Sequence, residues 1–282
     1  MSPYKVLCAL ALGILVAGAT GCGSSAGKGT AAPPAASASA DPTGKVKAAY
    51  DATVKAGTAK VALTANLAST GAGPQSSVQI AGEGTEDFVH HNSALTVSVP
   101  GQGSIEERVV AGKTYVHLPP ALVARNGGKQ WVTKSPDATS SSSVNDPTTD
   151  LALLRGVTSV KEAGKEAVRG QDGTHYTATA DLGAAKAAAD PGQAATFDQL
   201  QKKLGTSSVP LEAWLDGQGR LVRLRYSLPA PAGAPATNGP SSPSQAPSTG
   251  GQLQVTEEFF DYGLPVNVEP PPADQIAGQA ST

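Results

Sequence analysis

Residues 60–67 have the sequence KVALTANL, in which apolar and polar side chains alternate. The odd-numbered positions are apolar, whereas Lys60, Thr64 and Asn66 are polar. Residues 95–99 (LTVSV) repeat the same pattern. An alternation of period two predicts strands that turn one face toward a core and the other toward water.

The rest of the chain extends this pattern into an α+β fold. Helices are predicted at 45–56, 150–154, 182–189 and 196–204, from their composition and from the Gly and Pro residues that flank them. Further strands are predicted at 78–84, 105–111, 114–118, 130–134, 157–163, 174–180, 209–216, 220–228 and 252–262. One curved antiparallel sheet with helices packed against its concave face fits this order best.

Residues 1–21 have the features of an export signal. Lys5 precedes the apolar run 6–16, and small residues then lead to Cys22. The run is shorter than the about 20 apolar residues that a membrane-spanning helix needs, so a cleaved signal peptide is predicted. The sequence ATGC at 19–22 resembles the bacterial lipobox, in which the cysteine receives a diacylglyceryl group before cleavage on its amino side.

A lipidated Cys22 would anchor the protein to the outer, extracytoplasmic face of the cell membrane, the membrane being its first partner. Two or more acyl chains, such as palmitate, make such attachment stable. The alternative is an ordinary secretory peptide that is cleaved elsewhere and leaves a free protein. The only other cysteine is Cys8, inside the predicted signal, so the exported part has no disulfide to stabilise it.

Composition divides the remaining chain into one domain and its flanking segments. Residues 22–43 are rich in Ala, Ser, Gly and Pro and are predicted to be a disordered tether. A single domain is predicted at 44–276, with mobile loops at 135–149 and 229–251. Residues 277–282 are predicted to be a disordered tail.

The charge balance argues against a nucleic-acid partner. The chain has 21 basic and 23 acidic residues, and only one basic residue lies within 1–21, so the exported part is slightly acidic. No basic stripe is present in the sequence, whereas proteins that bind nucleic acid present a basic patch.

Several segments together resemble the LppX/LprG group of actinobacterial lipoproteins, whose domains share the half-barrel of the LolA and LolB carriers. The resemblance covers about residues 45–276. It implies a half-barrel that encloses an apolar cavity for the acyl chains of glycolipids or phospholipids, and therefore a lipid carrier or chaperone. The segments are TYVHLP at 114–119 with QWV at 130–132, LALLRGV at 151–157, VRG at 168–170 with THY at 174–176, PLEAWLD at 210–216 with GRL at 219–221, DYG at 261–263, VNV at 266–268 and PPP at 270–272.

The positions predicted to line this cavity follow from the alternation in the strands. Large side chains are scarce, since aromatic residues make up 4% of the chain. We therefore expect that a sheet wrapped around helices would not fill its interior to the usual packing density. The other interpretation is a general bias toward small residues with no cavity. The predicted lining residues are Leu63, Leu67, Ile80, Leu95, Val97, Tyr115 and Leu224.

No enzymatic, metal or cofactor site is predicted. His90, His91, His117 and His175 do not occur in a zinc-binding pattern, and the exported chain has no thiol beyond Cys22. Ser104 lacks the glycine two positions later that a nucleophile elbow needs. Trp131 and Trp214, although able to stack on a ligand, are predicted to be core residues.

The sequence is also consistent with two functions other than lipid binding. The first is an interaction or sensor domain with a filled core that engages another envelope protein. The second is a cell-wall hydrolase, which would need carboxylates from the pairs Glu106–Glu107 and Glu257–Glu258 to converge in one cleft. Adjacent strand residues face opposite ways, so each pair is more simply one solvated acid and one partly satisfied acid.

Overall fold

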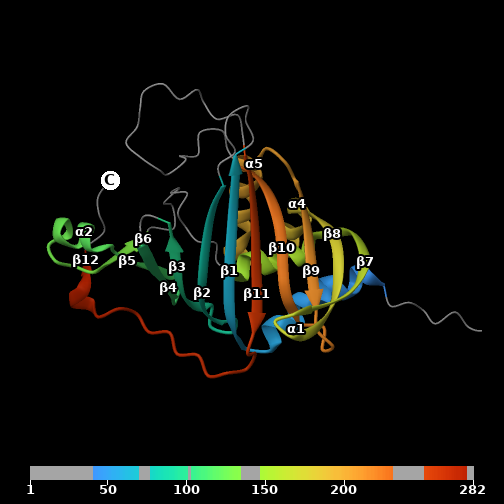
Figure 1. Ribbon diagram of the computed structural model, residues 1–282, viewed down its shortest axis with the longest axis horizontal. Helices are drawn as coiled ribbons and strands as arrows, with labels where there is room; N and C mark the ends of the chain where they lie inside the picture. Colours follow the sequence, from blue (N-terminus) through green and yellow to red (C-terminus); the bar gives the residue numbers. More distant parts are fainter. Residues whose placement is uncertain (1–40, 70–76, 101–102, 135–146, 231–250, 278–282) are drawn as a thin grey trace, which may run out of the picture. The chain divides into compact units, whose positions relative to one another are not determined.

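The computed structural model describes residues 41–69, 77–100, 103–134, 147–230 and 251–277 (Figure 1). The predicted export signal, Cys22, most of the predicted tether and nearly all of the predicted tail lie outside these residues. No helix among them is long and apolar enough to cross a membrane.

A twelve-stranded sheet dominates the described chain. Its strand order is β12-β6-β5-β4-β3-β2-β1-β11-β10-β9-β8-β7, and every neighbouring pair is antiparallel except β12 with β6. The strands are β1 (Thr58–Ser69), β2 (Ser77–Asp87), β3 (Asn92–Val99), β4 (Gly103–Val110), β5 (Lys113–His117), β6 (Trp131–Lys134), β7 (Val157–Val168), β8 (Gln171–Asp181), β9 (Ser208–Leu215), β10 (Leu221–Ala230), β11 (Gly251–Phe260) and β12 (Ile276–Ala277).

The main helices lie on one side of this sheet, behind it in the view of Figure 1. Residues of α1, α4, α5 and the 3-10 turn η2 share one apolar core with the strands, which confirms the predicted curved sheet with helices on its concave face. The helices are α1 (Pro42–Lys55), α2 (Pro120–Val123), α3 (Pro147–Leu151), α4 (Leu182–Ala188) and α5 (Pro191–Leu204), with 3-10 turns η1 (Ala124–Asn126), η2 (Ala152–Gly156) and η3 (Ala273–Gln275).

Two helices begin earlier than predicted, each at a proline that follows an aspartate. α1 starts at Pro42 rather than at residue 45, because the carboxylate of Asp41 accepts hydrogen bonds from the amides of Thr43 and Gly44. α5 starts at Pro191 rather than at residue 196, with Asp190 preceding it. Proline in the first helical turn is favourable, since its missing N–H would have no intrahelical partner there.

Helix and strand residues extend into the ends of both predicted loops. α3 begins at Pro147, inside the predicted loop 135–149, while residues 135–146 lie outside the described chain. β10 continues to Ala230 and β11 starts at Gly251, inside the predicted loop 229–251, and residues 231–250 again lie outside.

The strand register defines two faces of the sheet. Leu224, Glu257, Leu63, Gly82 and Val97 lie in one cross-strand row on the face that the helices cover, here called the inner face. Directly paired residues of an antiparallel sheet point to the same side. The other residues of each strand point to the opposite, outer face.

The C-terminal segment crosses the ends of several strands to reach the far edge of the sheet. It leaves β11 and runs to β6, where β12 pairs in parallel with residues 131 and 132 (Figure 1). The amide of Gln130 donates to the carbonyl oxygen of Gln275 over 3.1 Å, and Arg108 donates to the carbonyl oxygen of Glu269 over 3.2 Å. This segment therefore covers the edge strand of the sheet.

Candidate functional site

Three of the predicted cavity-lining residues meet in one row of the inner face. Leu63, Val97 and Leu224 are buried and belong to the main core, and the register aligns them across five strands. Leu95 is buried on the same face, one row away. The alternation in the sequence thus grouped these four side chains correctly, while their contact with a ligand stays a prediction.

Two others lie on the same face nearer the end of the sheet. Ile80 is in line with Ala65 and packs against the main core while partly exposed. Leu67 pairs with Leu253 and with Val78, and it is also only partly buried. The inner face therefore changes from buried to partly open along β1.

Tyr115 does not join this group. Its register partner is Arg108, whose row continues to Ala94 and then to Thr85, and these residues point to the outer face. Tyr115 is buried there, on the part of the sheet that the C-terminal segment reaches. A shift of one residue exchanges the two faces of a strand, and periodicity alone does not fix it.

Buried polar groups accompany the apolar side chains of the inner face. Glu257 is 1% exposed in the middle of the row described above. The hydroxyl of Tyr226 donates to the carboxylate of Asp150 over 2.8 Å, with both residues buried. Carboxylates are buried in proteins where hydrogen bonds or opposite charges stabilise them. This core therefore contains stabilised polar side chains as well as apolar ones.

An open pocket of about 450 Å³ lies between α1, the turn that joins β2 to β3, η2 and the segment before α5. Arg155 contributes to it and is held in place: its guanidinium lies 3.8 Å from the ring centroid of Tyr50, pairs with Asp51 over 3.2 Å and donates to the carbonyl oxygen of Ala188 over 2.6 Å. Burial raises the pKa of Tyr50, although Arg155 opposes this.

The walls of this pocket are both polar and apolar. Val54, Phe88 and Val89 provide apolar surface, and Lys55 and His91 provide polar surface. Phe88 is buried and lies 6.3 Å from Phe259 of the main core, measured between ring centroids. The pocket therefore opens next to the core under the sheet.

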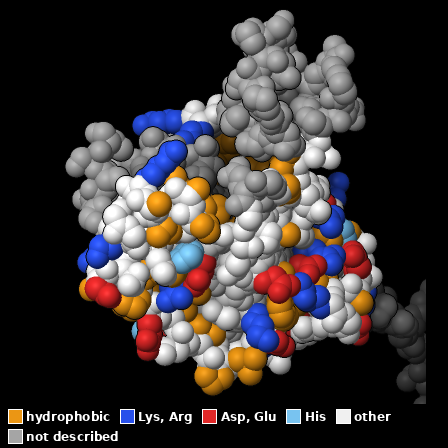
Figure 2. Space-filling model, turned by 60° about the vertical axis from the view of Figure 1, so that its left-hand side comes forward, with side chains coloured by type: hydrophobic (Ala, Val, Ile, Leu, Met, Phe, Trp, Pro, Cys, Tyr) orange, Lys and Arg blue, Asp and Glu red, His pale blue; other side chains and the backbone are white. Residues whose placement is uncertain are grey.

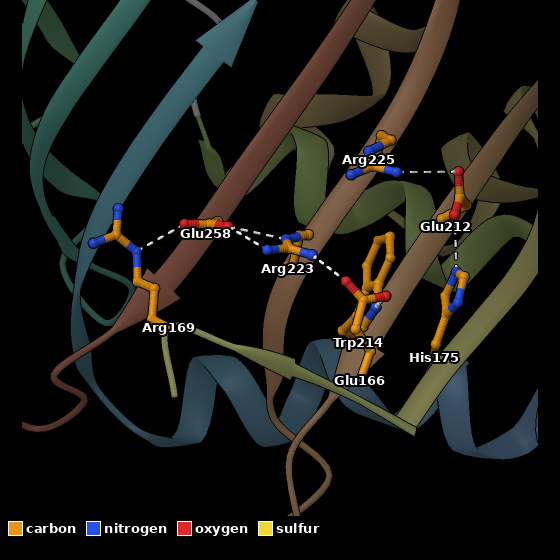
Figure 3. Close-up of polar contacts among 8 residues, drawn as sticks. All are labelled: Glu166, Arg169, His175, Glu212, Trp214, Arg223, Arg225 and Glu258. Carbon is orange, nitrogen blue, oxygen red and sulfur yellow. Dashed lines mark hydrogen bonds and ion pairs between the residues drawn. The ribbon is translucent and has the colours of Figure 1, made fainter. Parts of the chain in front are cut away.

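A second cluster occupies the outer face, where the β7–β8 hairpin folds across β9, β10 and β11 (Figure 3). Arg169, at the hairpin tip, donates to Glu258 over 2.7 Å, and Arg223 contacts the other carboxylate oxygen of Glu258 over 2.8 and 2.9 Å. Arg223 also donates to Glu166 of β7 over 3.1 Å. The hairpin is thus tied to the strands beneath it by ion pairs.

Trp214 is at the centre of this outer cluster. Its Nε1 donates to Glu166 over 2.9 Å, and the ring of His175 stacks on it with a centroid distance of 4.2 Å and an interplanar angle of 2° (Figure 3). Hydrogen bonds from Trp214 and Arg223 lower the pKa of Glu166. Trp214 is 1% exposed and is packed with Val168 and Val222, so it offers no open platform for a ligand.

The carboxylates of the proposed hydrolase site do not converge. Glu106 and Glu258 face the outer side, where they pair with Arg108 and with Arg169 and Arg223, respectively. Glu107 and Glu257 face the inner side, but they lie on β4 and β11 with three strands between them. At about 4.8 Å per strand, their backbones are separated by roughly 19 Å along the sheet, a wide spacing for a pair of carboxylates that act on one glycosidic bond.

Three of the four histidines contact other side chains in the described chain. His90 pairs with Asp87 over 2.7 Å, His117 contacts the edge of Trp131, and His175 pairs with Glu212 over 2.8 Å. Within residues 41–277, as far as the structure describes them, no three His, Cys, Asp or Glu side chains are grouped closely enough to hold a metal ion. No group of the sequence therefore has the geometry of a metal site there.

Comparison with known proteins gives one curated relative. No protein-family model matches the chain. The chain is 26% identical over 188 residues to an uncharacterized 31.2 kDa protein from the rplA-rplJ intergenic region of Streptomyces griseus. The alignment covers 61% of this chain and 56% of that protein. The chain thus spans about half the length of the curated relative that it matches.

Solved structures similar to this chain include bacterial lipoproteins. The lipoprotein LppX of Mycobacterium tuberculosis is 15% identical, with a TM-score of 0.46 over 80% of this chain and 97% of LppX. LprF of Mycobacterium bovis is also 15% identical, with a TM-score of 0.43 over 82% and 96% of the two chains. A LolA superfamily protein of Nitrosomonas europaea is 10% identical, with a TM-score of 0.32 over 80% and 94%.

Proposed function

We propose that this protein is a lipid-anchored, extracytoplasmic binding protein that holds an acyl lipid or another apolar ligand against the inner face of its sheet and carries it without chemical change. The observation that carries the proposal is the partly open end of the inner face. There, Leu67, Ile80 and Leu253 continue the apolar surface of the buried rows without being fully covered.

Burial of apolar surface supplies the binding energy in this proposal. Each methylene group that leaves water contributes about 0.8 kcal/mol. An acyl chain laid along Leu67 and Ile80 would remove its own methylene groups and these side chains from water together. No cofactor takes part in such binding.

The anchor in this proposal is Cys22, modified as the lipobox-like sequence before it predicts. Only 18 residues separate it from Asp41, where the described domain begins. A flexible chain of that length spans on average about 25 Å. The ligand would thus be bound and released close to the outer leaflet of the cell membrane. Glycolipids and phospholipids are therefore the candidate ligands.

Native mass spectrometry of the chain from residue 23, expressed in a bacterium with its membranes intact, tests the binding. A co-purified molecule with the mass of an acyl lipid is expected. Ile80→Glu should abolish this and the uptake of a fluorescent fatty acid, because it puts a charge on the inner face. Gln79→Glu is the matched control, since Gln79 is exposed on the outer face of the same strand. A ligand-free protein that takes up no fatty acid would contradict the proposal.

A second candidate is an interaction or sensor domain of the cell envelope. The observation in its favour is the packing above Leu224, where α1, η2 and α5 join the strands in one continuous core. In that case both Glu variants should behave alike, and no lipid should accompany the protein. The same experiment therefore separates the two functions.

A further inference from the structure

The turn between β2 and β3 presents an apolar side chain to solvent. Val89 is 62% exposed, the most among the exposed large hydrophobic residues of the described chain. Hydrogen bonds close the turn: the carboxylate of Asp87 accepts from the amides of Val89 and His90, each over 3.0 Å. Phe88 fixes its base, since its side chain is buried and its amide donates to the carbonyl oxygen of Gly57.

A second exposed apolar residue lies at the same end of the sheet. Leu264 is 46% exposed, and its carbonyl oxygen accepts a hydrogen bond from the hydroxyl of Thr58 over 2.6 Å. Thr58 is the first residue of β1 and pairs with Asp87, which precedes the turn. Figure 2 shows hydrophobic side chains at the lower end of the molecule, the end at which Figure 1 places the start of β1 and the end of β11.

Two ion pairs lie beside these two residues. Lys60 contacts Asp261 over 2.9 Å, and His90 contacts Asp87 over 2.7 Å. Burial raises the pKa of Asp87, but the hydrogen bonds from the side chain and amide of His90 and the amide of Val89 outweigh this and lower it overall. Val89 and Leu264 therefore offer an apolar contact, beside which Lys55 and His91 of the pocket wall are exposed.

The open pocket begins at the same turn, because Val89 also forms part of its wall. We propose that Val89 and Leu264 form a membrane-contact edge, which rests on the outer leaflet of the bilayer and places the mouth of the pocket against the lipids. The pocket lies at the start of β1, whereas Leu67 and Ile80 lie toward the other end of the inner face. The inference rests on the proposed function insofar as a lipid that enters at the pocket then moves along the inner face toward these residues.

The position of the predicted anchor favours the bilayer as the occupant of this edge. Cys22 is separated by 18 residues from Asp41, at the start of α1. α1 has 14 residues and so is about 21 Å long, and its far end leads directly into Gly57 and β1. A flexible chain that spans about 25 Å is long enough to let the edge reach the membrane to which Cys22 is attached.

Tryptophan placed at the edge would report the contact. The chain from Cys22 has a single thiol, so it can be coupled to a maleimide-bearing phospholipid in phosphatidylcholine vesicles without relying on lipidation in a cell. Val89→Trp and Leu264→Trp are made separately. Leu122→Trp is the matched control. Leu122 is 39% exposed and lies in α2, between β5 and β6, away from the membrane-contact edge. The native Trp131 and Trp214 are buried and supply the background.

Nitroxide-labelled lipid should quench the fluorescence of Val89→Trp and Leu264→Trp roughly twofold or more over that of Leu122→Trp, since apolar contacts insert to the boundary between headgroups and acyl chains. High salt should leave most of the quenching in place, because the apolar side chains of Val89 and Leu264 make the contact. Equal quenching of the three variants, or none, would overturn the contact edge.

Uptake of a fluorescent fatty acid from solution by the parent chain is measured in parallel. Edge quenching without uptake would retain the contact edge and reject the proposed function, whereas uptake without edge quenching would do the reverse. With both present, Leu264→Asp should slow uptake from vesicles at least several-fold and leave uptake from solution unchanged, because Leu264 is not part of the pocket wall. A vesicle rate that does not change would overturn the link between edge and pocket.

Discussion

Gly84 occupies a position where β2 and β3 approach too closely for any side chain. A Cβ atom there would lie 2.1 Å from the carbonyl oxygen of Ala94 and 2.8 Å from the Cα of Leu95. Since both are backbone atoms, the strands themselves would have to separate. We expect Gly84→Ala to lower the free energy of unfolding by about 2 kcal/mol or more, as measured by urea denaturation.

Gly217 provides the control for this substitution. It lies in the turn between β9 and β10, where a Cβ atom would meet nothing within 4 Å beyond its own chain neighbours. Gly217→Ala should change stability by less than about 1 kcal/mol. Equal losses in the two variants would show that the close approach of β2 and β3 has no special role.

Glu166 gives a pH dependence whose sign follows from its contacts. Hydrogen bonds from Trp214 and Arg223 lower its pKa in the folded protein, below the value of about 4.3 expected for an unfolded chain. Its ionised form therefore stabilises the fold above about pH 4.3, and this contribution is lost as the pH falls through the lower folded pKa. We expect Glu166→Gln to be less stable than the parent at pH 6, with the difference shrinking toward pH 3 in thermal melts.

Glu83→Gln is the comparison for this experiment, because Glu83 is exposed on the outer face of β2. It should leave the pH profile of the parent unchanged. A gap between the parent and Glu166→Gln that stays constant from pH 6 to pH 3 would mean that the carboxylate charge of Glu166 does not contribute.

The face of the sheet to which a residue points could be predicted for some residues and not for others. Leu63, Val97 and Leu224 could be assigned to one face because the alternation within each strand is clear, and the structure aligns them. Tyr115 was harder, because its short strand Lys113–His117 has no long alternation to fix its register. Trp214 is buried, as predicted, but its neighbours could not be predicted. The partners of Trp214, on β7, β8 and β10, depend on how a hairpin folds over distant strands, which periodicity does not encode.

Side-chain hydrogen bonds and ion pairs connect the β7–β8 hairpin to the strands beneath it. Glu166 and Arg169 bind its tip to Trp214, Arg223 and Glu258. Partly exposed ion pairs are worth little one by one, about 0.2–1 kcal/mol each. Removing them together in Glu166→Gln with Arg169→Ala should speed amide hydrogen exchange severalfold at residues 164–173 and leave the other strands unchanged.

Lys186→Ala serves as the reference for the hairpin variant, because it removes a well-formed ion pair with Asp198 between α4 and α5, away from the outer face. Its exchange at residues 164–173 should match that of the parent. Unchanged exchange in the double variant would show that the backbone ladder with β8 holds the hairpin without these ties.

The elements themselves were largely predictable, and their ends were less so. Long alternating runs located most strands, while α1 and α5 start nearer the N-terminus than predicted, at Pro42 and Pro191. The signal is present in the sequence as Asp followed by Pro, although only Asp41 caps its helix with its side chain. β12 was not predicted. It has two residues and is defined only by its pairing with β6, which no local pattern reveals.

At the scale of the whole molecule, the fold class follows from the order of helices and strands, whereas function depends on what fills the inner face. The same apolar residues produce a packed core beneath α1 and α5 and a partly open surface at Leu67 and Ile80. Side-chain volume distinguishes these outcomes only after register and helix placement are known. Composition alone therefore left a cavity and a filled core as equal possibilities.

The attachment of the molecule to its membrane is tested by Cys22→Ala in the full chain. If Cys22 carries the acyl chains, the parent should sediment with membranes and incorporate radiolabelled palmitate, because two or more chains hold a protein stably in a bilayer. The variant should incorporate no label and should either remain unprocessed or pass into the medium. Replacement of Ser24 by Ala, two residues further on, is the control and should change neither property. A Cys22→Ala protein that is processed normally and still sediments with membranes would show that the membrane is reached by a route other than this cysteine.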